Sequence, residues 1–166
     1  VTNSADVQAM IASAVNAYGR LDGALNNAGI EGTFTNIVKM TEADYERTVN
    51  VDLKGVWLCV KYEVEQLLKQ GSGGSIVSTA SVAGLIGTRG GSAYCAAKHG
   101  VVGLTKCVAL EYARKNIRVN AVCPGVIQTP MVERMTTDTG ITTQALIDQE
   151  PMARLGEPRE IGEAVV

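Results

Sequence analysis

The chain has 166 residues, a length that fits one ordinary domain. Apolar residues make up 46% and charged residues 19%, and the fifteen basic and seventeen acidic residues leave a net charge of −2. This composition is typical of a folded globular protein, and with no basic run and no apolar stretch of membrane-spanning length it predicts neither a nucleic-acid partner nor a membrane partner.

The first third of the chain is predicted to hold a helix, a strand and the start of a long second helix. Apolar residues at helical spacing from Val7 to Val15 predict the first helix, with Ser4 as its N-cap and Gly19 as its stop. Residues 21–26 predict a short buried strand. Thr41 and the acidic residue three positions later resemble a capping box, and the helical spacing then continues to about Lys69.

The rest of the chain alternates strands and helices. We predict strands at residues 75–78 and 117–122, a helix at 92–114, a loop with short helices at 126–156, and a final helix beginning at about Glu157. Short strands between long helices are typical of a doubly wound, Rossmann-like α/β fold, with a parallel sheet covered by helices on both faces. Three strands are few for this fold, and no GxGxxG or P-loop motif is present.

Tyr94 and Lys98 form a YxxxK pair within the predicted helix at 92–114. Residues four apart lie on one helix face, so the Lys98 ammonium can favour the Tyr94 phenolate and make it a general base or acid. A surface pair without function is the alternative interpretation. His99 and Cys95 adjoin this pair but face other directions on a helix, and with one histidine we predict no metal site.

Polar or glycine-bearing segments follow each of the three predicted strands. They are Asn26-Asn27-Ala28-Gly29, the turn that contains Ser81, and Pro124-Gly125-Val126-Ile127-Gln128-Thr129. Because the carboxyl ends of parallel strands meet at one sheet edge, where open α/β sheets place their sites, we expect these segments to converge.

These motifs in this order, together with Asn50 in Val49-Asn50-Val51, resemble the short-chain dehydrogenase/reductase family across nearly the whole chain. The resemblance implies that Tyr94 is the catalytic acid/base and that Lys98 lowers its pKa and binds the nicotinamide ribose. It implies that Ser81 binds the substrate oxygen and stabilises its developing charge. It also implies that Asn50 holds a water in a proton relay, a role compatible with a helix-distorting asparagine.

The same resemblance implies an NAD or NADP cofactor. Tyr94 and Lys98 would contact this cofactor. On its adenosine-ribose side the contacts would come from Asn27, Ala28 and Gly29. The segment after the third predicted strand would add Pro124, Gly125, Ile127 and Thr129, of which Ile127 and Thr129 would hold the nicotinamide carboxamide. The family's Gly-rich cofactor turn has no match in this chain, so we expect residues 1–166 to be one incomplete domain, the catalytic half, inactive by itself.

The resemblance predicts an oxidoreductase that interconverts a secondary alcohol and a ketone, as a cytoplasmic homodimer or homotetramer built on the helices at 42–69 and 92–114. The four cysteines, which lack CxxC or metal-like spacing, agree with a reducing compartment. Two alternatives stay open: a non-catalytic relative or fragment that binds partners or nucleotide, and a sugar-nucleotide epimerase or dehydratase, which could also use YxxxK. The sequence does not identify the substrate.

Overall fold

A three-stranded parallel sheet forms the centre of the computed structural model, which describes residues 1–166. The strands lie in the order β1 (Gly23–Asn26), β2 (Gly74–Thr79) and β3 (Ile117–Val122). Leu25 pairs with Val77, which in turn pairs with Asn120. The sheet confirms the predicted fold class, although β1 begins two residues later than expected.

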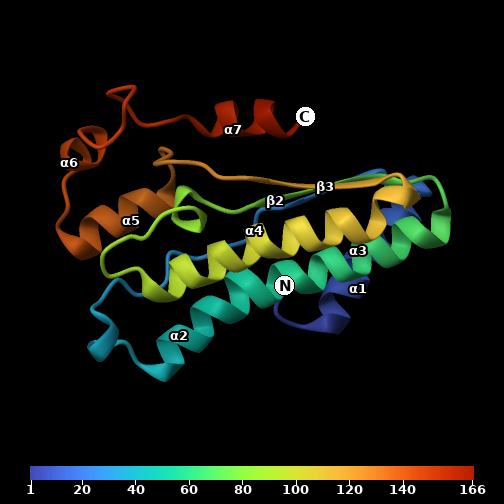
Figure 1. The fold of residues 1–166 in the computed structure, drawn as a ribbon, viewed down its shortest axis with the longest axis horizontal. Helices are drawn as coiled ribbons and strands as arrows, with labels where there is room; N and C mark the ends of the chain where they lie inside the picture. The colour runs from blue at the N-terminus through green and yellow to red at the C-terminus, as the bar shows by residue number, and fades with distance from the viewer.

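Helices cover both faces of this sheet (Figure 1). The helices α1 (Ser4–Tyr18), α3 (Val56–Gln70) and α4 (Ser92–Tyr112) pack on one face, and α7 (Pro158–Val165) lies on the other. The main core joins the inner stripes of α3 and α4 to the alternating residues of β2 and β3. Its buried members are Val56, Val60, Val64, Leu67, Ile76, Ala80, Val101, Val108, Ile117 and Val119.

The predicted helix from residue 42 to 69 is divided into three parts. α2 spans Glu42–Val49, a π-helical segment η2 spans Asn50–Gly55, and α3 continues from Val56. A π turn inserts an extra residue into the helical register and is frequent at functional sites. The distortion therefore begins at the asparagine that sequence reasoning singled out as a poor helix former.

The predicted capping residues of α1 and α2 are confirmed except at the N-terminus of α1. Asn3, rather than Ser4, caps α1, because its Oδ1 accepts from the Ala5 N–H at 2.8 Å. Gly19 ends that helix in the left-handed conformation, at φ 81°, as predicted. At α2, Thr41 Oγ1 accepts from the Asp44 N–H at 3.1 Å, which confirms the predicted cap.

The segment after β3 holds the short helices α5 (Pro130–Thr139) and α6 (Thr143–Ile147), as predicted. Ile127 forms an isolated parallel bridge with Gly156. α7 begins with a capping box between Glu157 and Glu160. No helix in the structure combines the length and the apolar character that crossing a bilayer requires.

Candidate active site

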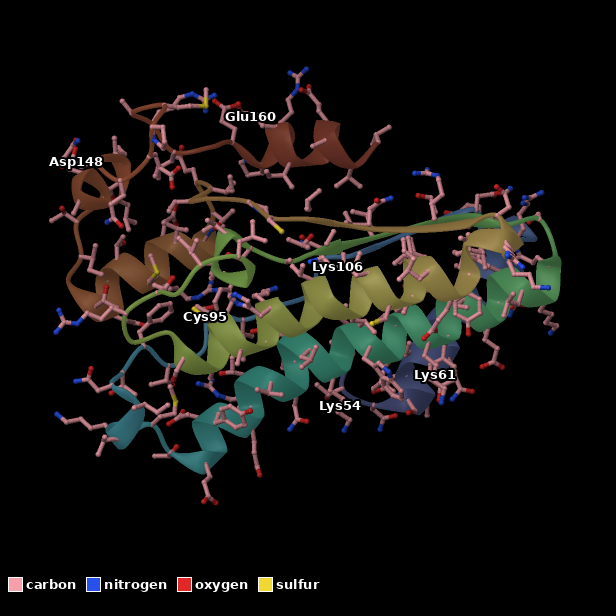
Figure 2. The ribbon with its side chains drawn as sticks, in the orientation of Figure 1. Lys54, Lys61, Cys95, Lys106, Asp148 and Glu160 are labelled. Atoms are coloured by element: carbon pink, nitrogen blue, oxygen red, sulfur yellow. The ribbon has the colours of Figure 1, made fainter.

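Tyr94 and Lys98 lie on one face of the first two turns of α4, beside the carboxyl end of β2. Lys98 Nζ lies 5.5 Å from the centroid of the Tyr94 ring and donates to the Thr79 carbonyl oxygen at 3.0 Å. Only 4% of Lys98 is exposed. Figure 2 locates this turn by the label of Cys95, near the N-terminal end of α4.

Ser81 is held against this helix by η3 (Val82–Gly84), a single 3-10 turn. Its Oγ accepts from the Ala83 N–H at 3.1 Å and so caps the turn. A Cβ on Gly84 would lie 2.8 Å from the Lys98 carbonyl oxygen, so only glycine allows η3 to approach the α4 backbone this closely. The approach brings the Ser81 hydroxyl to the Tyr94 phenol, where it acts to lower the pKa of Tyr94. The structure thus unites Ser81, Tyr94 and Lys98, as the spacing predicted.

Burial has the largest effect on the pKa values of Tyr94 and Lys98. It raises the pKa of Tyr94 above its usual value, against the effect of Ser81, and the nearby Asp52 carboxylate raises it further. Burial also lowers the pKa of Lys98, and Asp52 opposes that change. In this structure burial therefore outweighs the hydrogen bond from Ser81 and the net direction of the Tyr94 pKa is upward, while the expected lowering of this pKa by Lys98 stays a prediction.

The turn after β1 reaches the same place. Asn27 Oδ1 accepts from the Thr79 hydroxyl at 2.9 Å, which ties this turn to the end of β2. A Cβ on Gly29 would lie 2.8 Å from Asp52 Oδ1 and 3.5 Å from Lys98 Nζ. Glycine at this position therefore lets the turn pass directly over both charged groups, whereas Asn27 and Ala28 are exposed.

Asn50, the fourth predicted catalytic residue, begins the π-helical segment η2. It is exposed, and its side chain makes no hydrogen bond within the chain. Asp52, two residues later in η2, is fully buried instead, and its Oδ1 accepts from the Ile30 N–H at 2.9 Å. Two positions along a helix turn a side chain to a different face, so Asn50 and Asp52 have different surroundings, and the role of Asn50 in holding a water stays a prediction.

The segment after β3 is the third strand-end segment at the carboxyl ends of the strands. The Pro124 carbonyl oxygen accepts from the Val82 N–H at 2.8 Å and joins the segment to η3. Thr129 caps α5: its Oγ1 donates to the Ile127 carbonyl oxygen at 3.3 Å and accepts from the Val132 N–H at 3.5 Å. Gly125 is exposed. The three strand-end segments converge as expected, while the cofactor contacts of this one stay a prediction.

A long-range ion pair crosses the same region. Arg134 of α5 makes two contacts with the Glu31 carboxylate, from Nε at 2.9 Å and from a second guanidinium nitrogen at 3.4 Å. The hydrogen bond from Arg134 holds the pKa of Glu31 below its usual value. Because Glu31 follows the Asn27–Gly29 turn, the pair fastens α5 to that turn.

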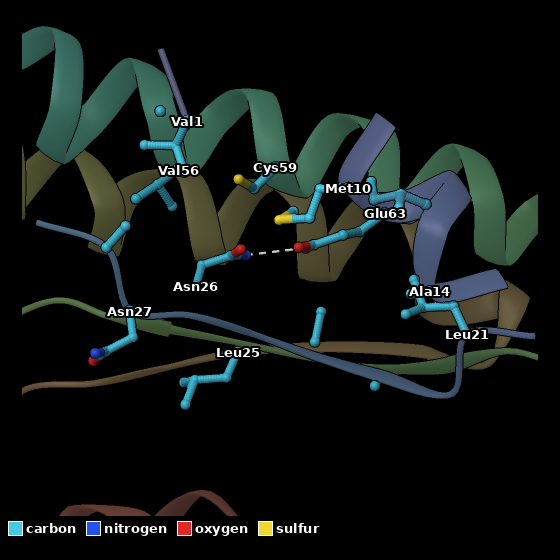
Figure 3. Close-up of a pocket in the computed structure, with 15 residues that line it drawn as sticks. Val1, Met10, Ala14, Leu21, Leu25, Asn26, Asn27, Val56, Cys59 and Glu63 are labelled. Atoms are coloured by element: carbon cyan, nitrogen blue, oxygen red, sulfur yellow. Dashed lines mark hydrogen bonds between the residues drawn. The ribbon is translucent and has the colours of Figure 1, made fainter. Parts of the chain in front are cut away.

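A separate cavity of about 260 Å³ lies between α1, α3 and the outer edge of β1 (Figure 3). Its lining is mostly apolar and includes neither Ser81, Tyr94 nor Lys98. Glu63 and Asn26 are its buried polar members, and Asn26 Nδ2 donates to Glu63 Oε2 at 3.0 Å. Burial raises the pKa of Glu63 to about 7.

The sequence of this chain is similar to those of known reductases and dehydrogenases. A family model described as enoyl-(acyl carrier protein) reductase matches residues 1–166. The chain is 38% identical to 2,5-dichloro-2,5-cyclohexadiene-1,4-diol dehydrogenase of Sphingobium indicum, in a match that covers 100% of this chain and 66% of the relative. The chain therefore spans about two thirds of the length of that relative.

Solved structures of dehydrogenases and reductases are also similar to this chain over nearly its whole length. Levodione reductase matches with a TM-score of 0.94 and 40% identity, over 99% of this chain and 65% of that one. NAD⁺-bound xylitol dehydrogenase matches with 0.91 and 32%, over 99% and 68% of the two chains. ElxO with NADP bound matches with 0.90 and 31%, over 99% and 66%.

Proposed function

The chain belongs to the short-chain dehydrogenase/reductase family, and on this premise we propose that it is the catalytic part of an NAD(P)-dependent oxidoreductase that interconverts a secondary alcohol and a ketone. The observation that carries the proposal is the cluster of Ser81, Tyr94 and Lys98 at the carboxyl ends of the strands. Open parallel sheets bind their ligands at this edge.

The proton chemistry follows from the state of Tyr94. A neutral phenol can donate its proton to a ketone oxygen as that oxygen gains charge, and the reverse transfer takes a proton from an alcohol. The Ser81 hydroxyl donates a hydrogen bond to the same oxygen and stabilises its charge. Lys98 keeps a positive charge beside the ring and favours the phenolate whenever the proton has left.

The chain's own groups suit a nicotinamide cofactor, NAD or NADP. The Lys98 ammonium donates one hydrogen bond to the Thr79 carbonyl, which leaves donors for ribose hydroxyls. The glycine at position 29 keeps the neighbouring turn free of a side chain. Asn27, Ala28, Gly29, Tyr94 and Lys98 would hold the cofactor, together with Pro124, Gly125, Ile127 and Thr129. When bound, the nicotinamide supplies the site at which a hydride is accepted or released.

We propose that these residues act within a longer protein. The matched relatives exceed this chain by about a third of their own length, and β1 pairs only with β2 here, so its other edge is free for a further strand. Residues 1–166 would then be the catalytic half of one Rossmann-like domain. Its partner would be a small alcohol or ketone, as the names of the diol dehydrogenase and levodione reductase suggest.

Two further properties complete the proposal. We infer a homodimer or homotetramer built on α3 and α4, because Trp57 of α3 is 45% exposed and Leu110 of α4 is 83% exposed. We also infer a cytoplasmic location, because all four cysteines are free thiols.

The test is turnover by the full-length natural protein that contains residues 1–166. It is incubated with NAD⁺ or NADP⁺ and a panel of secondary alcohols, cyclohexanol and cyclic diols included, and reduced nicotinamide is followed by its absorbance. We expect alcohol-dependent reduction of at least one cofactor. Cofactor binding without turnover would instead identify a binding protein. Isomerisation of a sugar nucleotide with no net reduced cofactor would identify an epimerase. Either result overturns the proposal.

A further inference from the structure

Asp52 is a fully buried carboxylate that the proton chemistry above does not use. It lies in η2, the π-helical segment between α2 and α3, and none of its surface is exposed. Oδ1 accepts from the Ile30 N–H at 2.9 Å, whereas Oδ2 has no hydrogen-bond partner within the chain. A buried carboxylate oxygen without a hydrogen-bond partner is unfavourable, so its presence requires an explanation.

The surroundings of Asp52 connect it to both sides of the site. Through Ile30 it holds the turn after β1, and the Gly29 backbone passes so close that a Cβ there would meet Asp52 Oδ1 at 2.8 Å. The same Cβ would lie 3.5 Å from Lys98 Nζ, so the carboxylate and the ammonium face one point of the turn. The two groups make no direct ion pair, and they interact through space at low dielectric.

Three other charged or titratable groups act on this position. Lys98 and Tyr94 approach from α4, and Glu31 approaches from the turn, where it is paired with Arg134 of α5. Burial raises the pKa of Asp52, and the charge of Lys98 opposes this rise. The Asp52 carboxylate in turn raises the pKa of Tyr94.

We propose that Asp52 is a charged positioning residue, which fixes the turn after β1 through Oδ1 and sets, through its negative charge, the pH range in which Tyr94 exchanges its proton. The inference rests on the proposed function of Tyr94. Its physical basis is that a carboxylate disfavours a second negative charge on the neighbouring phenol. An uncharged residue at position 52 therefore lets the phenolate form at a lower pH.

The test separates the two roles with Asp52→Asn, whose amide oxygen still accepts from Ile30 while the charge is lost. Asp6→Asn, at an exposed site in the first turn of α1, is the matched control for charge removal. In the full-length protein, the pH dependence of kcat/KM for alcohol oxidation is compared among wild type and both variants. We expect the acidic limb to move to lower pH by about one unit in Asp52→Asn alone.

A second readout does not depend on turnover. The tyrosinate absorbance of Tyr94 is titrated without substrate, with the spectrum of Tyr94→Phe subtracted, and its midpoint should fall in Asp52→Asn. Absence of activity in wild type would overturn the proposed oxidoreductase but leave this titration interpretable. A folded Asp52→Asn protein with an unchanged midpoint and an unchanged pH profile would overturn the role of Asp52. If Asp52→Asn does not fold, Asp52→Thr, whose hydroxyl can accept from Ile30, takes its place in both measurements.

Discussion

Glu63 lies on α3 at the cavity beside β1, with its carboxylate directed at Asn26 (Figure 3). Only 3% of the residue is exposed, and burial raises its pKa from 4.5 to about 7, while the hydrogen bond from Asn26 acts in the opposite direction. Below pH 4.5 the group is protonated in both the folded and the unfolded chain. Above pH 7 the folded state must bury a carboxylate, so the free energy of unfolding falls as pH rises through this interval.

Glu63→Gln should remove this pH dependence, because glutamine keeps an oxygen that can accept from Asn26 and carries no charge. The variant should be as stable as wild type near pH 4.5 and more stable at pH 8, by about 3 kcal/mol at most. Denaturant unfolding of the full-length protein at both values measures the difference. Glu65→Gln, on the exposed face of the same helix, is the control and should leave the curve unchanged. A Glu63→Gln protein no more stable than wild type at pH 8 would contradict the assignment.

Much of the site could be predicted at the scale of single residues, but the position of Asp52 was missed. The i, i+4 spacing of Tyr94 and Lys98 and the strand-end position of Ser81 were enough to place three groups together. Asp52 was missed because the motif match in this helix was placed on Asn50, two positions earlier. The signal was present, since Asp52 shares a helix face with Thr48 and Val56, which are both buried. An acid on a buried face is the observation that could have identified it.

At the scale of elements, the alternation of strands and helices predicted the sheet and its parallel direction. The π segment at Asn50–Gly55 could not be read from the sequence, because helical periodicity alone does not show an inserted residue. The tight contact of η3 with α4 was also hidden. It depends on a glycine whose nearest neighbour, the Lys98 backbone, is fourteen positions away in the chain.

This contact gives a prediction for Gly84→Ala. The added Cβ would meet the Lys98 carbonyl oxygen at 2.8 Å, and because both are attached to backbone, η3 must move away from α4. Ser81 would move with it, so kcat should fall by about tenfold or more while the chain stays folded. Gly87→Ala is the matched control, since a Cβ there has no neighbour within 4 Å. Steady-state kinetics and circular dichroism of both variants measure the effect, and equal activity of the two would contradict the account.

At the scale of the whole molecule, residues 1–166 make three parallel strands, and both β1 and β3 are edge strands that pair only with β2. Free N–H and C=O groups on such an edge pair readily with other chains. The family match also implies that pyrophosphate binding depends on a Gly-rich turn and a helix N-terminus that have no counterpart among these residues. Binding and turnover are therefore expected of the full-length protein rather than of this segment.

Residues 1–166 expressed alone should bind NADH and NADPH far more weakly than the full-length protein does, and should tend to aggregate. Fluorescence titration of both cofactors into the two proteins, with light scattering to follow assembly, measures the difference. Light scattering of the full-length protein also tests the proposed homodimer or homotetramer. A soluble, cooperatively unfolding 1–166 segment with micromolar cofactor affinity would show that the site is complete within these residues.

Tyr94→Phe in the full-length protein tests the central claim most directly, because it removes the phenolic proton and keeps the ring. Tyr18→Phe, at a tyrosine that is 83% exposed on α1, is its control. Nicotinamide-linked turnover of an active alcohol is measured for both, with cofactor affinity measured separately. The account predicts that Tyr94→Phe lowers kcat by about 10²–10⁴-fold with little change in cofactor affinity, whereas Tyr18→Phe behaves as wild type. A Tyr94→Phe protein that turns over within about threefold of wild type would show that Tyr94 is not the acid/base.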